Sequence, residues 1–266
     1  DVCSSDLRIV ASAGWSYKWG VQQRRSQHRI DLLDINYLYM PSIDSLFREK
    51  YLEKDENYIL KYNYEDRFIV RTGYSYIYNS AGRALMNNSG IGNSYTIRLN
   101  FESAGNLLYA VAKLGGMKKN ASGEYTLLNI PFAQYLKGDF DFAKNLVIDN
   151  RNSLAFHFGA GIAIPYGNAT MLPFEKRYFS GGANSVRGWS VRDLGPGSFP
   201  GDNNFMNQSG DIKLDASIEY RTRLFWKFRG ALFVDAGNIW TIRDYKDQPG
   251  GQFKFDKFYK IGRASC

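Results

Sequence analysis

Long apolar runs are missing from this 266-residue sequence, and no stretch approaches the roughly 18 to 20 apolar residues that a membrane-spanning helix needs. Cysteine is nearly missing as well. The two present, Cys3 and Cys266, stand at the chain ends, so neither a disulfide framework nor a redox compartment can be inferred from them. Histidine occurs only as His28 and His157, and neither has neighbours typical of metal ligands, so we expect no metal site.

Sequence signatures of catalysis are also missing. The chain contains no G-x-S-x-G elbow, no Walker loop and no HExxH motif. The stretch 159–163, GAGIA, is faintly similar to a dinucleotide-binding loop, but it lies inside an alternating segment and no helical pattern follows it. We therefore expect neither an enzyme active site nor a cofactor.

The net charge of +8 could in principle indicate a nucleic-acid partner. However, Lys and Arg are spread through strands and connectors instead of clustering, and no nucleic-acid-binding module is present. The sequence therefore argues against nucleic acid as a partner.

Both ends of the chain look foreign to the rest. Residues 1–7 read DVCSSDL and residues 261–266 read IGRASC, and each resembles the translation of a common sequencing adapter. We therefore expect the natural insert to cover residues 8–260 as one partial domain of a longer protein, with both cysteines outside it. Resequencing with longer reads tests this expectation.

Alternation of apolar and polar residues with a period of two dominates the chain, over segments long enough to cross a bilayer as tilted strands. The first segment is the clearest: Trp15, Tyr17 and Trp19 fall on one face, and Ser16 and Lys18 on the other. Eight complete strands are expected, at 9–21, 29–40 (less regular), 68–79, 95–102, 136–142, 154–164, 212–220 and 228–240, with a further one starting at Phe258. The pattern predicts an all-β protein.

Connectors of two lengths alternate along the chain. The long ones are 41–67, 105–132, 166–210 and 241–257, and the short ones are 23–28, 80–93, 149–152 and 225–227. Short helices are expected near 43–54 and at 107–114 inside the long connectors. Long loops on one side and short turns on the other are typical of outer-membrane barrels, so we predict an incomplete transmembrane antiparallel β-barrel.

The longest connector carries the most distinctive motif, the run PFEKRYFSGGANSVRGWSVRDLGPG at 173–197. Glycine pairs such as Gly181 and Gly182 reach backbone conformations that other residues adopt only at a cost. Arg187 is a single guanidinium flanked by apolar residues, which suits insertion beside a waiting carboxylate. The alternative is a glycine-rich surface loop with one solvated arginine. The candidate site residues of the loop are Gly181, Gly182, Ser185, Val186, Arg187, Gly188 and Trp189.

This run resembles the signature loop of the outer-membrane barrel-assembly superfamily, which includes BamA, TamA and the two-partner secretion exporters. The shared pattern is GG-x-x-SVRG-aromatic, and the wider similarity, which includes GDIKLDASIEYR and ALFVDAGNIW, is greatest for TamA-like members. The resemblance implies that the chain holds about eight of the sixteen strands of a family barrel, with 166–210 folded back into the lumen. It is strongest from residue 130 onward.

Two acidic residues are the expected partners of Arg187. By strand parity Glu219 and Asp235 both face the lumen from neighbouring strands, and two adjacent carboxylates are unfavourable unless a cation joins them. The resemblance implies that Arg187 is this cation. The alternative is that Glu219 pairs with Arg221 or with another lumenal base such as Arg229.

The resemblance implies an assembly or insertion factor in the outer membrane of Gram-negative bacteria, without catalytic residues, that helps client β-barrel or surface proteins to fold. In the family a weak seam between the first and last strands opens and accepts client strands by edge pairing. The implied partners are unfolded outer-membrane proteins, periplasmic domains of the same chain and outer-membrane lipid. The alternatives are a polypeptide exporter of the two-partner secretion type, the barrel of a patatin-fused lipase and, more distantly, a simple porin.

Overall fold

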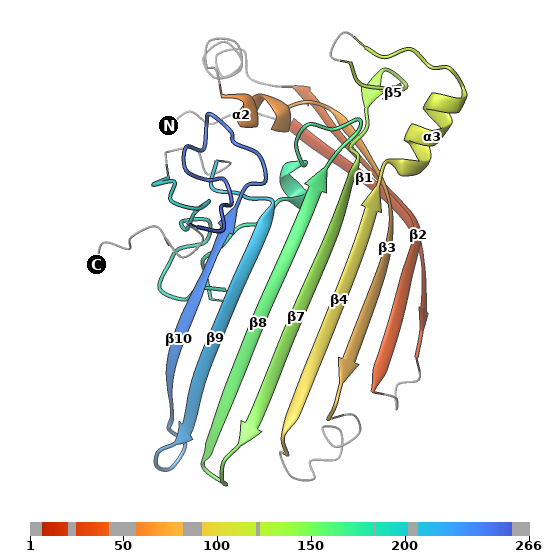
Figure 1. Ribbon diagram of the computed structural model, residues 1–266. Helices are drawn as coiled ribbons and strands as arrows, with labels where there is room; N and C mark the ends of the chain where they lie inside the picture. The colour runs from red at the N-terminus through yellow and green to blue at the C-terminus, as the bar shows by residue number, and fades with distance from the viewer. Residues whose placement is uncertain are drawn as a thin grey trace.

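A computed structural model describes residues 7–20, 25–42, 57–81, 92–120, 123–183, 185–201 and 207–256. Eight long strands form one antiparallel sheet in the order β1-β2-β3-β4-β7-β8-β9-β10, so each strand pairs with its neighbours along the chain (Figure 1). These strands are β1 Leu7–Trp19, β2 Ser26–Ser42, β3 Arg67–Asn79, β4 Ser94–Ala104, β7 Tyr135–Val147, β8 Asn152–Pro165, β9 Ile212–Arg223 and β10 Arg229–Trp240. The all-β prediction and the eight strands are confirmed, as an open sheet.

Short elements occupy the connectors. They are α2 Tyr58–Asn63, α3 Asn106–Leu114, the hairpin β5 Thr126–Leu127 and β6 Ile130–Pro131, and the single 3-10 turn η3 Phe174–Lys176. The helix predicted at 107–114 is α3. The helix predicted near 43–54 and the strand predicted from Phe258 lie outside the described residues. The sequence missed the β5–β6 hairpin because strands of two residues are too short to show an alternating pattern.

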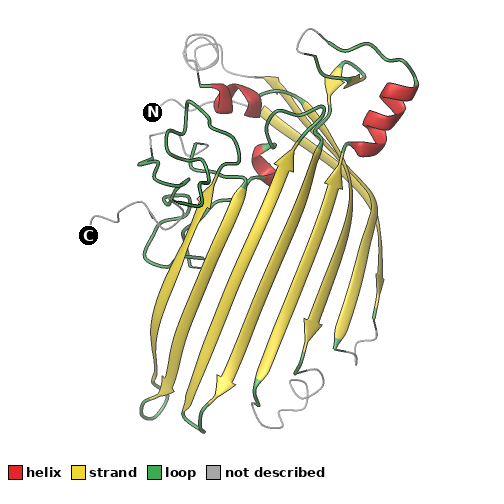
Figure 2. Ribbon diagram, viewed as in Figure 1, coloured by secondary structure: helices red, strands yellow, loops and turns green. Residues whose placement is uncertain are grey.

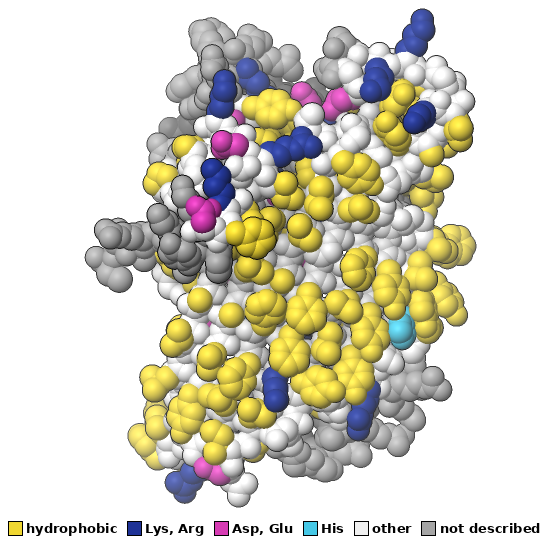
Figure 3. Space-filling view, viewed as in Figure 1, with side chains coloured by type: hydrophobic (Ala, Val, Ile, Leu, Met, Phe, Trp, Pro, Cys, Tyr) yellow, Lys and Arg dark blue, Asp and Glu magenta, His cyan; other side chains and the backbone are white. Residues whose placement is uncertain are grey.

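The two faces of the sheet differ in chemistry as the alternation predicts. One face carries large exposed apolar side chains, for example Trp15, Leu232 and Val234, each with more than 70% of its surface exposed. Figure 3 shows apolar side chains spread over much of this face, with few charged groups among them. A water-soluble monomer rarely exposes so large an apolar area, whereas a strand that faces lipid must do so.

A β-bulge explains why the second strand looked less regular in the sequence. The pairing of β2 with β3 shifts register between Asp31 and Asp34. Asp31 pairs with Gly73 and Asp34 with Arg71, so both carboxylates lie on the inner face although their spacing is odd. The bulge thus adds an inward carboxylate that simple parity would place outside.

The long connectors gather at one end of the sheet and the short turns at the other (Figure 2). The connector between β8 and β9 runs back behind the sheet, along its inner face (Figure 1). A buried cluster that includes Tyr135, Leu172, Tyr178 and Ile239 joins this connector to the strands. The core of the molecule therefore lies between the sheet and its infolded loop. Among the described residues, no helix is long and apolar enough to cross a membrane.

Candidate functional site

The signature loop makes a tight turn that points its tip at the last two strands. The amide of Gly182 donates to the carbonyl of Trp189 at 2.9 Å, and the amide of Arg192 donates to the carbonyl of Ser180 at 3.0 Å. Gly181 adopts a φ of 98°, and a Cβ at this position would lie 2.1 Å from the carbonyl oxygen of Ser190. A residue other than glycine would therefore need the loop to open.

Arg187 lies between two inward carboxylates of neighbouring strands. Its Nε and Nη2 donate to the two oxygens of Asp235 on β10, each at 2.8 Å, and its Nη1 donates to Glu219 on β9 at 2.5 Å. The backbone amide of Arg187 donates to Asp235 as well, at 2.9 Å. The planar guanidinium thus forms a bidentate pair with one acid and a single bond with the other.

The three charged side chains of this contact are largely shielded from solvent. The side chains of Asp235, Glu219 and Arg187 are 3%, 15% and 26% exposed. The guanidinium also lies 3.7 Å above the ring of Phe233, where the aromatic face favours a cation. Hydrogen bonds to Asp235 first, and then to Glu219, raise the pKa of Arg187 above its ordinary value. Its charge is therefore permanent at any physiological pH.

The alternative pairing of Glu219 coexists with this contact. The second carboxylate oxygen of Glu219 accepts a hydrogen bond from Arg221 Nε at 2.6 Å. A carboxylate has enough lone pairs for both guanidinium groups, so the two pairings do not compete. Arg229 is exposed at the start of β10.

The remaining residues of the signature loop have unequal surroundings. Val186 is 7% exposed and packs against Gly237 of β10, where an added Cβ would lie 3.0 Å from a Val186 methyl group. The Ser185 hydroxyl lies 3.4 Å from that of Ser180, and Trp189 is half-buried. Gly188 has a φ of 95°, yet a Cβ there would meet nothing within 4 Å.

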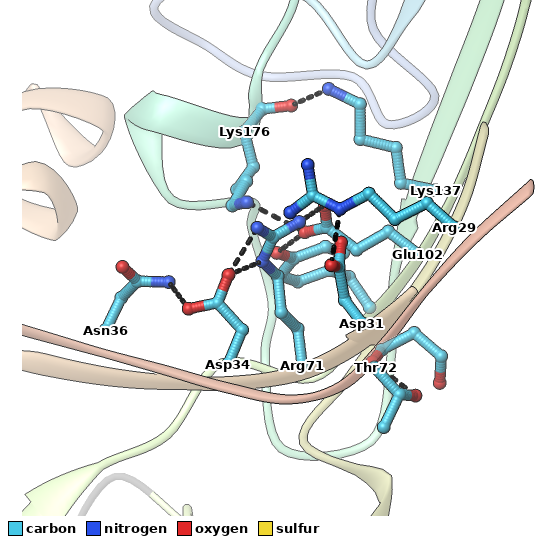
Figure 4. A network of polar contacts seen from close by, with 11 residues as sticks. Arg29, Asp31, Asp34, Asn36, Arg71, Thr72, Glu102, Lys137 and Lys176 are labelled. Atoms are coloured by element: carbon cyan, nitrogen blue, oxygen red, sulfur yellow. Dashed lines mark hydrogen bonds and ion pairs between the residues drawn. The ribbon is translucent and has the colours of Figure 1, made fainter. Parts of the chain in front are cut away.

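A second attachment, which the sequence did not predict, ties the start of the loop to the middle of the sheet (Figure 4). Lys176 Nζ lies 2.8 Å from Glu102 on β4, and its carbonyl accepts from Lys137 Nζ at 3.2 Å. Glu102 is also paired with Arg71 on β3 at 2.7 Å, and Arg71 in turn bonds Asp34 on β2. The loop is therefore linked through charged groups to β2, β3, β4 and β7.

Tyr178 strengthens this second attachment. Its hydroxyl donates to Asp139 on β7 at 2.5 Å, and Lys137 Nζ lies 4.2 Å above its ring. Burial, and next the Asp139 carboxylate, raise the pKa of Tyr178 above its ordinary value, so the hydroxyl remains a donor. Parity places Asp139 and Lys137 on the inner face of the sheet. Their contact with Tyr178, however, depends on the register of the strands and the path of the loop, which no local sequence pattern reveals.

A buried ion pair joins the start of the same loop to its end. Arg177 Nε lies 3.5 Å from Asp211, and both side chains are fully buried. Arg177 also donates to Gln248 at 3.3 Å, and Gln248 donates to the carbonyl of Ser209 at 2.8 Å. Burial raises the pKa of Asp211 above its ordinary value, while Arg177 opposes that rise. These contacts bind the loop to the connector after β10.

The two histidines have different surroundings. His157 faces inward, 2.7 Å from Asp141 and 3.6 Å from Asp215, and so lines the inner face as a paired polar residue. His28 faces outward and stacks on Trp19 with ring centroids 5.0 Å apart. Within the ranges that the structure describes, no three His, Cys, Asp or Glu side chains are grouped to hold a metal ion.

One solved structure supports the fold, and a second is less similar. BamA from Haemophilus ducreyi, lacking POTRA domains 1–3, matches 89% of this chain and 43% of its own, with a TM-score of 0.56 and 18% identity. CdiB from Escherichia coli matches 92% of this chain and 35% of its own, with a TM-score of 0.45 and 13% identity.

Comparison of sequences identifies the family. The outer membrane protein assembly factor BamA of Neisseria meningitidis serogroup B is 32% identical over 96 residues, which span 33% of this chain and 12% of that protein. The model of the Omp85 superfamily domain matches residues 4–258. Together with the sheet, this match places the protein in the outer membrane of Gram-negative bacteria. The chain therefore belongs to the Omp85 superfamily.

Proposed function

We propose that this chain is the barrel part of an outer-membrane protein assembly factor of the BamA/TamA type, which helps client β-barrel or surface proteins to fold and insert. The observation that carries the proposal is the contact of Arg187 with Asp235 and Glu219, which joins the infolded loop to two neighbouring strands. The similarity to the Neisseria meningitidis assembly factor supports the same class of function.

In this proposal the loop has a mechanical function. Asp235 and Glu219 would repel each other across adjacent strands if both were ionised without Arg187. With Arg187 in place, the pair of strands becomes an attachment point that keeps the loop inside the lumen. Removing one partner of a buried charged contact costs about 3 to 5 kcal/mol. Because the Arg187 side chain keeps a quarter of its surface exposed, we expect the lower end of that range.

The proposed partners follow from this function. They are unfolded outer-membrane proteins, periplasmic domains of the same chain and the lipid around the barrel. Client strands would bind by edge pairing, in which backbone hydrogen bonds supply the affinity, so no cofactor and no covalent step are needed.

The test uses the full-length protein in cells depleted of their own copy, with folded client barrels measured by their heat-modifiable migration. Arg187→Ala should reduce folded clients strongly, and Arg187→Lys should retain part of the function because it keeps the charge. Arg229→Ala is the matched control, since Arg229 is exposed at the far end of the same strand as Asp235.

Two outcomes would overturn the proposal. If Arg187→Ala leaves client barrels at the level of the Arg229→Ala control, the contact does not serve assembly. If client barrels are normal but one secreted polypeptide fails to leave the cell, the protein is an exporter of the two-partner secretion type.

A further inference from the structure

Helix α3 carries an apolar stripe that the fold does not use. Leu107, Val111 and Leu114 are 64%, 57% and 89% exposed, and Ala110 is exposed between them. Their spacing of three and four residues aligns them along one side of the helix. The described residues leave this stripe uncovered, although it repeats the pattern of a buried helix face.

The opposite side of α3 is the one that packs on the protein. Ala112 is 2% exposed, and the ring of Tyr109 meets that of Tyr125 edge-on at 5.4 Å. The side chain of Asn106 accepts hydrogen bonds from Gln134 at 2.9 Å and from Tyr166 at 2.6 Å. These contacts fix the rotation of the helix, so the exposure of the stripe is a consequence of packing.

The position of α3 places the stripe at the rim of the lipid-facing surface. The helix begins two residues after β4 ends, on the side of the sheet where the long loops gather. The last large apolar residue on the outward face of β4 is Phe101, which is 59% exposed. Figure 3 shows the region of α3, at the upper right, on the same side of the molecule as the apolar outer face.

The charge around α3 is of one sign. Between Glu102 and Glu124 the chain has three lysines, Lys113, Lys118 and Lys119, and no acidic residue. All three lysines are exposed. An apolar stripe next to lysines is typical of helices that lie in a membrane interface, where lysines reach headgroup phosphates.

From these observations we infer that α3 is an interfacial helix that lies in a lipid surface carrying phosphate groups, on the long-loop side of the membrane. Acyl chains would cover the stripe, and phosphates would bind Lys113, Lys118 and Lys119. A protein covering the stripe would explain the apolar residues but not the unbalanced positive charge beside them. The inference depends on the outer-membrane location and not on the assembly activity.

Spin labels on single cysteines test this directly in the full-length protein. Cysteines of the full-length protein are first replaced, and labels then stand at Leu107, Val111 and Leu114 and, for comparison, at Asp244 and Lys246, two exposed residues of the long connector after β10. The protein is reconstituted in phosphatidylcholine vesicles with and without phosphatidylglycerol. We expect the stripe labels to be more accessible to oxygen than to a water-soluble nickel reagent, and the comparison labels to show the reverse.

Replacing the three lysines by glutamine tests separately whether they bind lipid phosphates. In wild type the stripe labels should lie deeper in phosphatidylglycerol-containing vesicles than in neutral ones. Lys113→Gln, Lys118→Gln and Lys119→Gln combined should abolish this difference, and the barrel should still fold because all three side chains are exposed.

Three results would overturn the inference. Stripe labels that are accessible to the nickel reagent in both vesicle types would place α3 in water. Stripe labels shielded from both reagents would show that protein covers the helix, either a second copy or another part of the chain. If the stripe labels of the triple lysine variant still lie deeper in the vesicles that contain phosphatidylglycerol, the three lysines do not bind phosphate.

Discussion

At the scale of single residues, the shape of the Arg187 side chain matters as much as its charge. The guanidinium makes two parallel bonds to Asp235 and one to Glu219, and lysine cannot reproduce this fork. We expect Arg187→Lys to destabilise the loop by about 1 to 3 kcal/mol, the cost of leaving a buried acceptor unpaired, and Arg187→Ala to cost more. The urea dependence of protease cleavage within the loop measures both. A midpoint for Arg187→Lys equal to that of the wild type would show that the fork is unimportant.

Arg177 is a second residue whose removal has a predictable effect, and this effect depends on pH. Arg177→Met leaves the Asp211 carboxylate buried without its cation, which costs about 3 to 5 kcal/mol. Burial already raises the pKa of Asp211, and losing Arg177 should raise that pKa further. Because the ionised form is the penalised one, the loss of stability grows as the pH rises through the folded-state pKa. Acidification from neutral pH should therefore restore protease resistance to the variant.

The double variant Arg177→Met, Asp211→Asn is the control for this pH effect. It has no buried charge at either position, so it reports how the other carboxylates of the protein respond to acid. We expect the recovery on acidification only in the single variant. The same recovery in the double variant would show that Asp211 is not the titrating group.

At the scale of elements, β8 carries a glycine on its inner face that makes room for the loop. A Cβ at Gly161 would lie 2.6 Å from the ring of Tyr178. Gly161→Leu should therefore displace Tyr178 and break its bond to Asp139, whereas Ala160→Leu faces outward and should be tolerated. Tyrosine fluorescence and protease cleavage of the loop in the full-length protein measure the difference. A tolerated Gly161→Leu would contradict the packing of Tyr178 against β8.

The turn of the signature loop allows a test with two similar glycines. Gly181 and Gly188 both have positive φ, but only Gly181 would bring a Cβ against a backbone oxygen. Gly188→Ala should cost about 1 kcal/mol from its backbone conformation alone, and Gly181→Ala should cost clearly more. Thermal unfolding of the two full-length variants checks the order. The reverse order would mean that the loop is not folded as described.

Local pattern predicted most of these elements. Period-two alternation identified the eight strands, because this signal lies within a dozen neighbouring residues, and the short helix expected at 107–114 is α3. The β2 bulge was visible only as irregularity, since the two inward carboxylates Asp31 and Asp34 break parity. The GAGIA stretch proved to be a strand whose glycines accommodate Tyr178 and Asp215. No local pattern could show this, because the two partners come from other elements.

At the site, too, local patterns were predictable and contacts between distant segments were not. Parity placed Glu219 and Asp235 inward, and a lone arginine in an apolar tip suggested a carboxylate partner. The attachments through Lys176, Tyr178 and Arg177 were not predicted, because each joins a loop residue to a partner that is far away in the sequence. Such contacts require the register of several strands and the path of the loop together.

At the scale of the whole molecule, the sheet is apolar outside and charged inside, the reverse of a soluble β-protein. Its outer face contacts lipid instead of water, so exposing apolar side chains on that face carries no free-energy penalty. Part of the inner face is instead covered by the chain's own loop, which is bound at two places, at the consecutive residues Lys176, Arg177 and Tyr178 and at Arg187. Because these contacts join the loop to the strands, the loop and the sheet form one packed unit. We therefore expect loss of the loop contacts to affect the function of the whole barrel.

The most direct test of this account is a double-mutant cycle on client assembly in the full-length protein, with Arg187→Ala, the pair Glu219→Gln and Asp235→Asn, and all three substitutions together. Heat-modifiable migration of client barrels is the measurement. If Arg187 acts through the two acids, the triple variant should be no worse than Arg187→Ala alone, because the interaction is already lost. Fully additive defects, or wild-type assembly in every variant, would contradict the central claim that this contact holds the loop for function.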